Sequence, residues 1–465
     1  MSFDYDVISI GAGSGGCASA MRSADLGKKV ALVEYREKGT GGTCVNRGCI
    51  PTKVLVKSAQ VYSEIKEAKQ YGILVGDVKA DQNAIQMKKQ AIVNNLKFGL
   101  DNFLLKSRKV DRIAGKAKFL DAHTLEITNG EEKKTVTAQN IIIATGSEPA
   151  MIPAFNIDRE KIITSDEALS IKDIPKELIV VGAGALGLEF AYIFSTFGAK
   201  VTIAEMMPNV VPILKEKEVT DVVEQYLKKT GIDVRCGSGI ASIQVNESGR
   251  VVCAFQNGES VEADMALVAI GRSLNTKDMG LEQIGVELNA KGQITINEKM
   301  QTTVENVYAV GDIVAGPQLS HKAQKQGLAA AENIAGTSSI VNMDVIPWAI
   351  FMQPEIAGVG ITAQDANDAG IETICGKMPF TANEKAITMQ KTAGVIKIVA
   401  RKDNHQIIGA QIFGIDASVL IEEIALAIET KLTLEDVAES IHAHPTLSEI
   451  VMETAKNALG KAFHK

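Results

Sequence analysis

The chain has 465 residues, of which 46% are hydrophobic and 23% charged, a globular composition long enough for about three domains. Its formal net charge of −7, without basic blocks, argues against nucleic-acid binding. Apolar runs fall far short of the ~18 residues that a membrane-spanning helix needs, and no basic, apolar leader precedes the first strand. Six cysteines are too few here for a disulfide-based scaffold, so we expect a cytoplasmic protein.

A glycine-rich turn between two predicted strands opens the chain. Tyr5–Ile10 is a short apolar strand that leads into G-A-G-S-G-G at 11–16 and a predicted helix to about Leu26. A second strand, Val30–Val33, ends at Glu34. Strand, glycine turn, helix, strand and acid in this order predict a dinucleotide-binding unit.

Each position of this turn has a physical role in such a unit. Gly11 permits the tight turn, Gly13 lets the backbone approach a pyrophosphate, and Gly16 lets the helix pack closely on the sheet. The pyrophosphate is expected at the helix N-terminus, where free N–H groups and the helix dipole favour an anion. Glu34 is expected to accept hydrogen bonds from a ribose.

Two cysteines follow in the stretch G-T-G-G-T-C-V-N-R-G-C-I-P-T-K at 39–53. Cys44 and Cys49 lie among glycines just ahead of Pro51, a residue suited to the first turn of a helix. A helix N-terminus lowers a thiol pKa, so we predict a pair that alternates between dithiol and disulfide. The alternatives are half of a zinc site or two incidental buried cysteines. Zinc needs four ligands, and no second Cys/His cluster has suitable spacing.

Less distinctive elements follow. Asn83–Lys109 has the apolar spacing of a long helix, which we interpret as packing. Ile141–Ala144 predicts a strand that ends at the small-residue turn Thr145-Gly146.

The dinucleotide-binding pattern then recurs. The strand Leu178–Val181 leads into G-A-G-A-L-G at 182–187, a helix to about Phe197 and a strand Val201–Ala204. In both copies the acid follows the first glycine by 23 positions (11 to 34 and 182 to 205). Two complete units with the same spacing predict two dinucleotide sites. The equivalent residues of the second unit are Gly182, Gly184, Gly187 and Glu205.

Two further strands end at residues that suit a cofactor site. Met265–Ile270 is followed by Gly271-Arg272, and Val307–Val310 is followed by Gly311-Asp312. Ligands of parallel sheets collect at the carboxyl ends of strands, so Asp312 is placed to contact a second part of a cofactor. The alternative for each is an ordinary strand-to-turn transition.

The last part of the chain, from about Val345, changes character. Ala393–Ala400 and Gln406–Phe413 predict an antiparallel hairpin, and helices are expected near Ser418–Thr430 and Leu434–Ser440. This α+β block carries no cofactor motif.

The segment I-H-A-H-P-T-L-S-E at 441–449 does carry possible acid/base chemistry. His444 lies close to Glu449, and a carboxylate can orient an imidazole as a general acid/base. A surface histidine near an unrelated first-turn glutamate is the alternative. His442 is the weaker candidate.

Taken together, these segments resemble the flavin-dependent pyridine nucleotide–disulfide oxidoreductases, most closely the dihydrolipoamide dehydrogenases. The resemblance rests on the cysteine stretch, both glycine units, the turn at 144–146, Gly311-Asp312 and the His-Pro-Thr segment with Glu449, and it covers essentially the whole length. It implies an α/β fold of two Rossmann-like dinucleotide-binding domains plus a C-terminal α+β dimerisation domain. The implied domains are 1–150 (FAD), 151–275 (NAD), 276–345 (central, completing the FAD site) and 346–465 (dimer interface).

The same resemblance assigns cofactor residues. Lys53 and Glu189 are implied to form an ion pair beside the flavin ring. FAD is implied to use Gly11, Gly13, Gly16, Glu34, Lys53, Thr145, Gly146 and Asp312. The other implied cofactor-binding residues are Ala117, Gly182, Gly184, Gly187, Glu189, Glu205, Gly271, Arg272 and Gly311. No metal is implied.

The implied reaction is oxidation of protein-bound dihydrolipoyl groups by NAD in a homodimer. Cys49 would lie nearest the flavin and Cys44 would exchange with substrate, while His444 of the partner subunit, held by Glu449, would take the substrate proton. The implied partners are lipoyl-bearing proteins of 2-oxo acid dehydrogenase or glycine cleavage complexes.

Two departures from the family pattern leave rival functions. Ser14 stands where a Pro is usual and resembles glutathione reductases, and Arg47 replaces an apolar residue. One rival is therefore an NAD(P)H-dependent disulfide reductase of the glutathione reductase type. The other is a binding subunit of a multienzyme complex, which intact residues at Cys44 and His444 disfavour.

Overall fold

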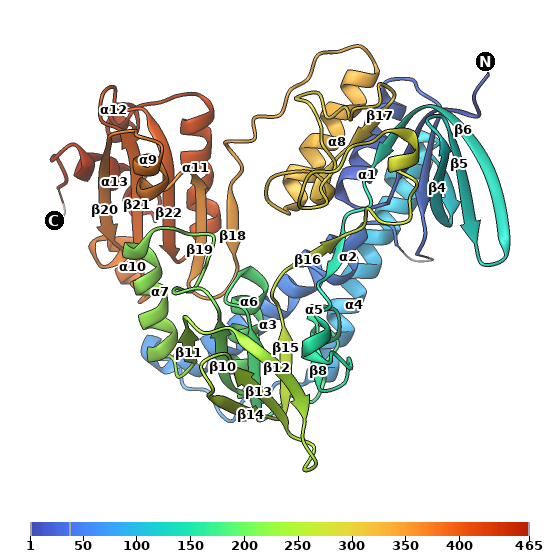
Figure 1. Cartoon of the computed structure of the whole chain (residues 1–465). Helices are drawn as coiled ribbons and strands as arrows, with labels where there is room; N and C mark the ends of the chain where they lie inside the picture. Colours follow the sequence, from blue (N-terminus) through green and yellow to red (C-terminus); the bar gives the residue numbers. More distant parts are fainter. Residues whose placement is uncertain (1, 37–38, 464–465) are drawn as a thin grey trace. The chain divides into compact units, whose positions relative to one another are not determined.

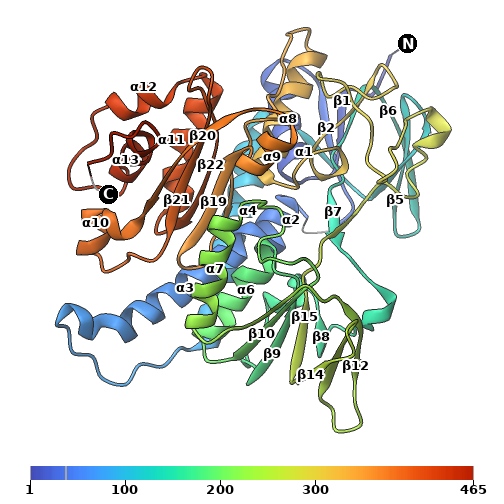
Figure 2. The same cartoon turned by 60° about the vertical axis from the view of Figure 1, so that its left-hand side comes forward.

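The computed structural model describes residues 2–36 and 39–463, which divide into two units (Figures 1 and 2). The first unit comprises residues 1–54, 86–150 and 271–343, and the second comprises 55–85, 151–270 and 344–465. The units combine segments of several predicted domains, whose boundaries stay a prediction. Within the described residues, no helix has the length and hydropathy to cross a membrane.

A mostly parallel sheet forms the centre of the first unit. Its strands run in the order β3-β2-β1-β6, and β17 pairs with the other side of β6. The strands β1, β2 and β17 and the end of β6 are largely apolar because the sheet is buried on both faces there. The bounds of the strands in this sheet are β1 Tyr5–Ile10, β2 Val30–Glu34, β3 Asp111–Ala114, β6 Glu132–Ile143 and β17 Val307–Ala309.

The long strand β6 belongs to two kinds of pairing. Its last residues, Ile141–Ile143, pair in parallel with β1 and β17, whereas its first half pairs antiparallel with β5. The sequence predicted only the apolar end of this strand. The antiparallel extension consists of β4 Lys116–Asp121 and β5 Thr124–Asn129, and a separate pair consists of β7 Ser147–Pro149 and β16 Arg272–Leu274.

Helices of the first unit position the predicted site. The helix α1 spans Ser14–Asp25 and lies beside α8, Ser320–Ile334 (Figure 1). The short helix α2, Gly42–Arg47, is followed by Gly48 and then by α3, Cys49–Glu67. Short 3₁₀ turns lie at Glu282–Ile284 and Gly311–Ile313.

The long helix predicted over Asn83–Lys109 is α-helical only in its first part. The α-helix α4 spans Gln82–Gly99 and continues as a π-helical segment, Leu100–Leu105, and a 3₁₀ turn, Lys106–Arg108. Glycine is a poor helix former, so Gly99 is a natural place for the α-helical pattern to change. Both α3 and α4 contribute residues to each unit.

The second unit contains a second parallel sheet, in the order β11-β10-β9-β15-β8. Its apolar strands are packed together with α6 and α7 in one hydrophobic core. An antiparallel sheet of β12, β13 and β14 follows β11 in the chain (Figure 1). The bounds are η1 Ala68–Tyr71, η4 Pro153–Phe155, β8 Ile162–Ile163, α5 Ser165–Ala168, β9 Glu177–Val181, α6 Ala185–Thr196, β10 Lys200–Glu205, α7 Lys217–Lys229, β11 Asp233–Cys236, β12 Ile240–Val245, β13 Val251–Phe255, β14 Ser260–Ala263 and β15 Met265–Val268.

An antiparallel sheet in the order β18-β19-β22-β21-β20 completes the second unit. The predicted hairpin is confirmed as β21 Val395–Arg401 and β22 Ile407–Gly414, and the two predicted helices are α11 Ala417–Glu429 and α12 Leu434–Glu439. Helices α11, α12 and α13 supply the apolar faces that bury this sheet (Figure 1). The remaining bounds are β18 Trp348–Ile350, β19 Glu355–Gly360, α9 Ala363–Asp368, β20 Thr373–Pro379, η7 Phe380–Ala382, α10 Glu384–Thr388 and α13 Glu449–Ala458.

Candidate active site

The predicted site residues fall into two groups, one in each unit. The first unit holds Gly11, Gly13, Gly16, Glu34, Cys44, Cys49, Lys53, Ala117, Thr145, Gly146, Gly271, Arg272, Gly311 and Asp312. The second unit holds Gly182, Gly184, Gly187, Glu189, Glu205, His444 and Glu449. The ion pair predicted between Lys53 and Glu189 stays a prediction. Glu189 is buried and accepts a hydrogen bond from the Phe351 N–H at 3.0 Å.

The first glycine turn has the geometry that a dinucleotide requires. Gly11 has a φ of +102°, and a Cβ there would lie 2.4 Å from the Ala144 carbonyl oxygen. A Cβ at Gly16 would lie 1.8 Å from the Gly11 carbonyl oxygen, which is far inside contact distance. Around Gly13, which precedes α1, no heavy atom lies within 4 Å of an added Cβ. The turn is thus tight on its inner side and open at the helix N-terminus, where a pyrophosphate would bind.

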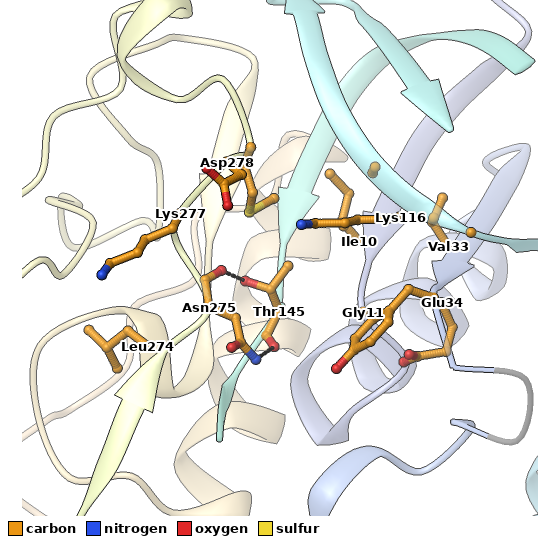
Figure 3. Close-up of a pocket in the computed structure, with 14 residues that line it drawn as sticks. Ile10, Gly11, Val33, Glu34, Lys116, Thr145, Leu274, Asn275, Lys277 and Asp278 are labelled. Atoms are coloured by element: carbon orange, nitrogen blue, oxygen red, sulfur yellow. Dashed lines mark hydrogen bonds between the residues drawn. The ribbon is translucent and has the colours of Figure 1, made fainter. Parts of the chain in front are cut away.

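Glu34 ties this turn to the next strand. Its Oε2 accepts the Ala12 N–H at 2.9 Å and its Oε1 accepts the Arg36 N–H at 3.0 Å. A cavity of about 360 Å³ lies in front of it (Figure 3). The lining residues include four of the predicted set, namely Gly11, Glu34, Ala117 and Thr145. A cavity of this size with a carboxylate at its edge fits one part of a dinucleotide.

A second polar network surrounds Asp312. The Ser147 hydroxyl donates to Asp312 Oδ2 at 2.5 Å, and Arg272 Nε donates to the same hydroxyl at 2.7 Å. Arg272 also donates to the Ser147 carbonyl oxygen at 2.7 Å. The structure therefore brings Arg272 and Asp312 together through Ser147, a residue that sequence reasoning missed.

Thr145 is held by another residue that the sequence did not single out. Its hydroxyl donates to the Asn275 carbonyl oxygen at 2.7 Å, and Asn275 Nδ2 donates to the Thr145 carbonyl oxygen at 3.0 Å. Asn275 also lines the cavity (Figure 3). The adjacent Gly146 has a φ of +67°, which turns the chain away from strand β6.

The second glycine turn repeats the first. A Cβ at Gly187 would lie 1.9 Å from the Gly182 carbonyl oxygen, and a Cβ at Gly184 would meet nothing within 4 Å. Glu205 Oε2 accepts the Ala183 N–H at 2.7 Å, and its Oε1 accepts the Met207 N–H at 2.8 Å. In both turns, therefore, the acid holds the N–H that follows the first glycine.

The two cysteines of the glycine-rich stretch form a hydrogen-bonded thiol pair. Cys44 lies within α2 and Cys49 is the first residue of α3, with all six cysteines of the chain present as thiols. Pro51 is the third residue of α3 rather than the first, so the helix begins earlier than the proline predicts. The reason is that Gly48 ends α2 and its carbonyl oxygen accepts the Thr52 N–H.

The environment of the pair favours one thiolate. A hydrogen bond from Cys49, together with one from the Ser320 hydroxyl and the charge of Lys53, lowers the pKa of Cys44 to about 6 although burial opposes this. The hydrogen bond to Cys44, burial and the Cys44 charge raise the pKa of Cys49. One proton thus leaves the pair near neutral pH, which supplies the thiolate that thiol–disulfide exchange requires.

Arg47, which departs from the family pattern, forms an ion pair with Glu148. Its guanidinium lies 3.1 Å from Glu148 Oε1, and the Arg36 guanidinium lies 2.7 Å from the same oxygen. The ion pair of Arg47 therefore links the cysteine-bearing helix α2 to strand β7 of the first unit.

In the second unit, His444 and Glu449 form the predicted pair. His444 Nδ1 lies 3.0 Å from Glu449 Oε1, and Glu449 Oε2 accepts the Thr446 N–H at 2.8 Å. The hydrogen bond and charge of Glu449 raise the pKa of His444, whose side chain is 63% exposed. His444 Nε2 lies 3.3 Å from Glu384, on α10. His442, the weaker candidate, is nearly buried and contacts Glu423 at 3.0 Å.

The chain matches two family models along most of its length. Residues 5–327 match the model of pyridine nucleotide-disulphide oxidoreductases, and residues 346–455 match the dimerisation domain of the same proteins. The chain belongs to this family. Its sheet topology and glycine turns confirm the predicted α/β fold with a C-terminal α+β domain.

Other members of the oxidoreductase family match over the full chain. A dihydrolipoyl dehydrogenase of Geobacillus stearothermophilus is 42% identical over 100% of this chain and 98% of its own length. A dihydrolipoyl dehydrogenase of Bacillus subtilis is 40% identical over 99% of this chain and 98% of its own length. Among solved structures, LpdA of Mycobacterium tuberculosis superposes with a TM-score of 0.89 at 26% identity, covering 97% of this chain and 99% of its own. RclA, an HOCl-induced flavoprotein disulfide reductase of Escherichia coli, has a TM-score of 0.86 at 26% identity over the same shares.

Proposed function

We propose that the chain oxidises protein-bound dihydrolipoyl groups to lipoyl, with FAD as bound cofactor and NAD as acceptor. The observation that carries this is the hydrogen-bonded pair of Cys44 and Cys49, whose first proton is weakly held. The full-length similarity to dihydrolipoyl dehydrogenases supports this substrate class.

The residues present suit both cofactors. We assign FAD to the first glycine turn, Glu34, Ala117, Thr145 and Asp312, because the tight turn, the cavity and the carboxylates lie in one unit. We assign NAD to the second turn, which has the same geometry. When bound, FAD supplies two-electron transfer between the thiol pair and NAD.

The chain's own residues would carry the sulfur chemistry. His444 takes a proton from the substrate dithiol, and the substrate thiolate attacks the Cys44 sulfur of the oxidised pair, which releases Cys49 as a thiolate. The second substrate sulfur then displaces Cys44, so that the lipoyl disulfide forms and the pair is left reduced. Lys53 lies where its charge favours thiolates on the pair.

We also propose that the working form is a homodimer. The match of residues 346–455 to a dimerisation domain supports it, and a closed twofold dimer is the commonest oligomer. In this arrangement the cysteines of one subunit meet His444 of the partner subunit. The lipoyl-bearing proteins of 2-oxo acid dehydrogenase or glycine cleavage complexes would be the partners, in the cytoplasm.

Steady-state assays of the purified holoenzyme test the proposed substrate. Turnover of dihydrolipoamide with NAD is expected to exceed turnover of glutathione disulfide with NADPH by orders of magnitude. Preferred turnover of glutathione disulfide would replace the proposal by the reductase function. No turnover of either substrate would leave a binding role.

We expect the enzyme to discriminate strongly against NADP. The carboxylate of Glu205 accepts from a ribose 2′-OH and repels a 2′-phosphate, and no Arg between 206 and 214 is present to pair with that phosphate. Glu205→Ala is expected to lower kcat/KM for NAD. The ratio of kcat/KM for NAD to kcat/KM for NADP should therefore fall. The matched change in the other unit, Glu34→Ala, should leave that ratio unchanged in molecules that retain FAD. Equal efficiency with both nucleotides in the unmodified protein would contradict this assignment.

The pH dependence of the reaction is expected to report the pairing of His444 with Glu449. His444 must be neutral to accept a proton, and Glu449 raises its pKa, so kcat/KM falls as the pH falls through this raised value. Glu449→Gln removes the charge, lowers the pKa of His444 and should shift the acidic limb of the kcat/KM profile to lower pH. An unchanged acidic limb would show that another group controls it.

A further inference from the structure

Two buried polar side chains of α8 contact the segment that carries Asp312. This segment, residues 311–316, comes between strand β17 and helix α8 in the chain (Figure 1). Lys322 and Gln326 are 1% and 0% exposed, and they lie four positions apart, which places them on the same face of the helix. Lysine is almost never fully buried unless it is paired, so the partners of these two side chains matter.

Each of the two side chains bonds to the backbone near one end of the segment. Gln326 Oε1 accepts the Gly311 N–H at 2.9 Å, and Lys322 Nζ donates to the Ala315 carbonyl oxygen at 3.2 Å. Gly311 comes directly before Asp312, and Ala315 lies three positions after it. The carboxylate is therefore carried by a short stretch of chain that is bonded to α8 on both sides.

Met343 packs beside both of these contacts. Gln326 Nε2 lies 3.6 Å from Met343 Sδ. A Cβ added at Gly316 would lie 2.8 Å from Met343 Cε and 3.6 Å from Lys322 Nζ. Gly316 also has a φ of +97°, a conformation that suits glycine. The end of the segment thus lies close against Lys322 and Met343, with no room there for a side chain.

Helix α8 is itself fixed against the first glycine turn. A Cβ at Gly327 of α8 would lie 2.3 Å from the carbonyl oxygen of Gly15, at the start of α1. The first residues of the two helices, Ser14 and Ser320, also have hydroxyl oxygens 2.6 Å apart. Since only glycine permits the approach at Gly327, the two helix ends are held together. Side chains that project from α8 therefore start from a fixed position.

The charge of Lys322 is not explained by packing. Burial lowers the pKa of Lys322 to about 8, and the carboxylate charge of Asp312 opposes this lowering. An apolar side chain of similar volume would avoid the cost of burying an ammonium, and such replacements are often neutral or stabilising. The contacts that the ammonium makes therefore account better for a lysine at this position than the stability that it adds.

We propose that Lys322 and Gln326, here called the α8 clamp, are positioning residues that hold the segment at 311–316 so that Asp312 stays in place to bind FAD. The inference rests on the proposed assignment of FAD to Asp312. The Ser147 hydroxyl orients the carboxylate at 2.5 Å, whereas the clamp fixes the backbone that carries it. Lys322 and Gln326 therefore act on the cofactor only through Asp312.

The rate at which FAD leaves the holoenzyme tests the α8 clamp without turnover. Holoenzyme is kept in a fixed, sub-denaturing concentration of guanidinium chloride, in which circular dichroism confirms that the chain stays folded. Samples taken at successive times are passed through a gel-filtration column, and the flavin that stays with the protein is measured by absorbance. Lys322→Met and Gln326→Met are each expected to raise the rate of FAD release about three- to tenfold, because each removes one hydrogen bond to the segment.

A double-mutant cycle with Asp312 shows whether the clamp acts through this carboxylate. Asp312→Ala alone is expected to speed the release of FAD, because the contact with the cofactor is lost. Lys322→Met added to Asp312→Ala should cause little further change, since the segment then has no carboxylate to position. Coupling of this kind is expected of residues that act as one unit, whereas independent effects on FAD release would add.

Two control variants separate the clamp from a general effect on the helix. Lys325→Met makes the same substitution at an exposed lysine of α8 and should leave the rate of FAD release unchanged. Gln326→Glu keeps an oxygen that can accept the Gly311 N–H, so its rate should stay near that of the unmodified protein. The pair Gln326→Met and Gln326→Glu tests the clamp even if Lys322→Met does not fold.

The possible outcomes distinguish the clamp from the proposed function. Unchanged release in Lys322→Met and Gln326→Met, full additivity with Asp312→Ala, equal release in Gln326→Glu and Gln326→Met, or faster release in Lys325→Met would each overturn the clamp. Unchanged release in Asp312→Ala would overturn the clamp together with the assignment of Asp312 to FAD. Failure of the dihydrolipoamide assay alongside the expected release rates would reject the proposed substrate and leave the clamp.

Discussion

A His444→Gln variant is expected to retain FAD and to lose about 10²–10⁴-fold in kcat with dihydrolipoamide, the contribution typical of a positioned acid/base. Glutamine matches the imidazole in reach but cannot take up a proton at neutral pH. The geometry supports this role because Glu449 lies 3.0 Å from Nδ1 of His444, and the imidazole, whose Nε2 lies 3.3 Å from Glu384, has a 63% exposed side chain. The control variant His442→Gln should lose far less kcat with dihydrolipoamide, since the His442 side chain is nearly buried and contacts Glu423.

Mixing two inactive variants would show which subunit supplies His444. Cys44→Ser and His444→Gln chains are unfolded, combined in equal amounts and refolded, and exchange is confirmed with a tag. Random pairing makes about half of the twofold dimers mixed. In a mixed dimer with shared sites, one site carries both changes and the other carries neither, so about a quarter of the normal activity should return. Confirmed mixed dimers without regained activity would show that His444 serves its own subunit.

The Cys44→Ser variant is expected to lose dihydrolipoamide turnover entirely while still binding FAD. Substrate sulfur has no disulfide to attack in this variant. The hydrogen bond and charge of Cys44 raise the pKa of Cys49, so removing Cys44 should lower it and leave Cys49 as a thiolate favoured by Lys53. A thiolate beside the flavin should appear as a long-wavelength charge-transfer band in the resting variant.

The reciprocal variant is the matched control for this assignment. Cys49→Ser should also lose turnover, because the disulfide is again absent, but it should lack the long-wavelength band. Visible absorption spectra of the two resting holoenzymes at equal FAD content make the comparison. A long-wavelength band in Cys49→Ser and none in Cys44→Ser would show that the proposed roles of Cys44 and Cys49 are the wrong way round.

Local features of the chain were predictable from the sequence alone. Each glycine unit is contiguous in the sequence, and its tight turn and open helix end depend on which residues lack a side chain. The pattern at 11–16 can therefore be recognised without knowledge of the fold. The pairing of His444 with Glu449 spans five positions and joins a loop to the start of α13, which again is local. The hairpin β21–β22 follows from two apolar runs separated by a short turn.

Only the tertiary structure decided which distant side chains meet. Ser147 contacts Arg272 across 125 positions and Asp312 across 165, and Ser14 contacts Ser320 across 306. Nothing in the local pattern around a serine specifies such a partner, because the partner is chosen by how strands and helices pack. For the pair of α1 and α8 the deciding feature is the glycine contact that brings the two helix ends together. The sequence therefore predicts where a dinucleotide and a thiol pair lie, whereas the hydrogen bond that orients Asp312 arises only when the sheet and its helices are assembled.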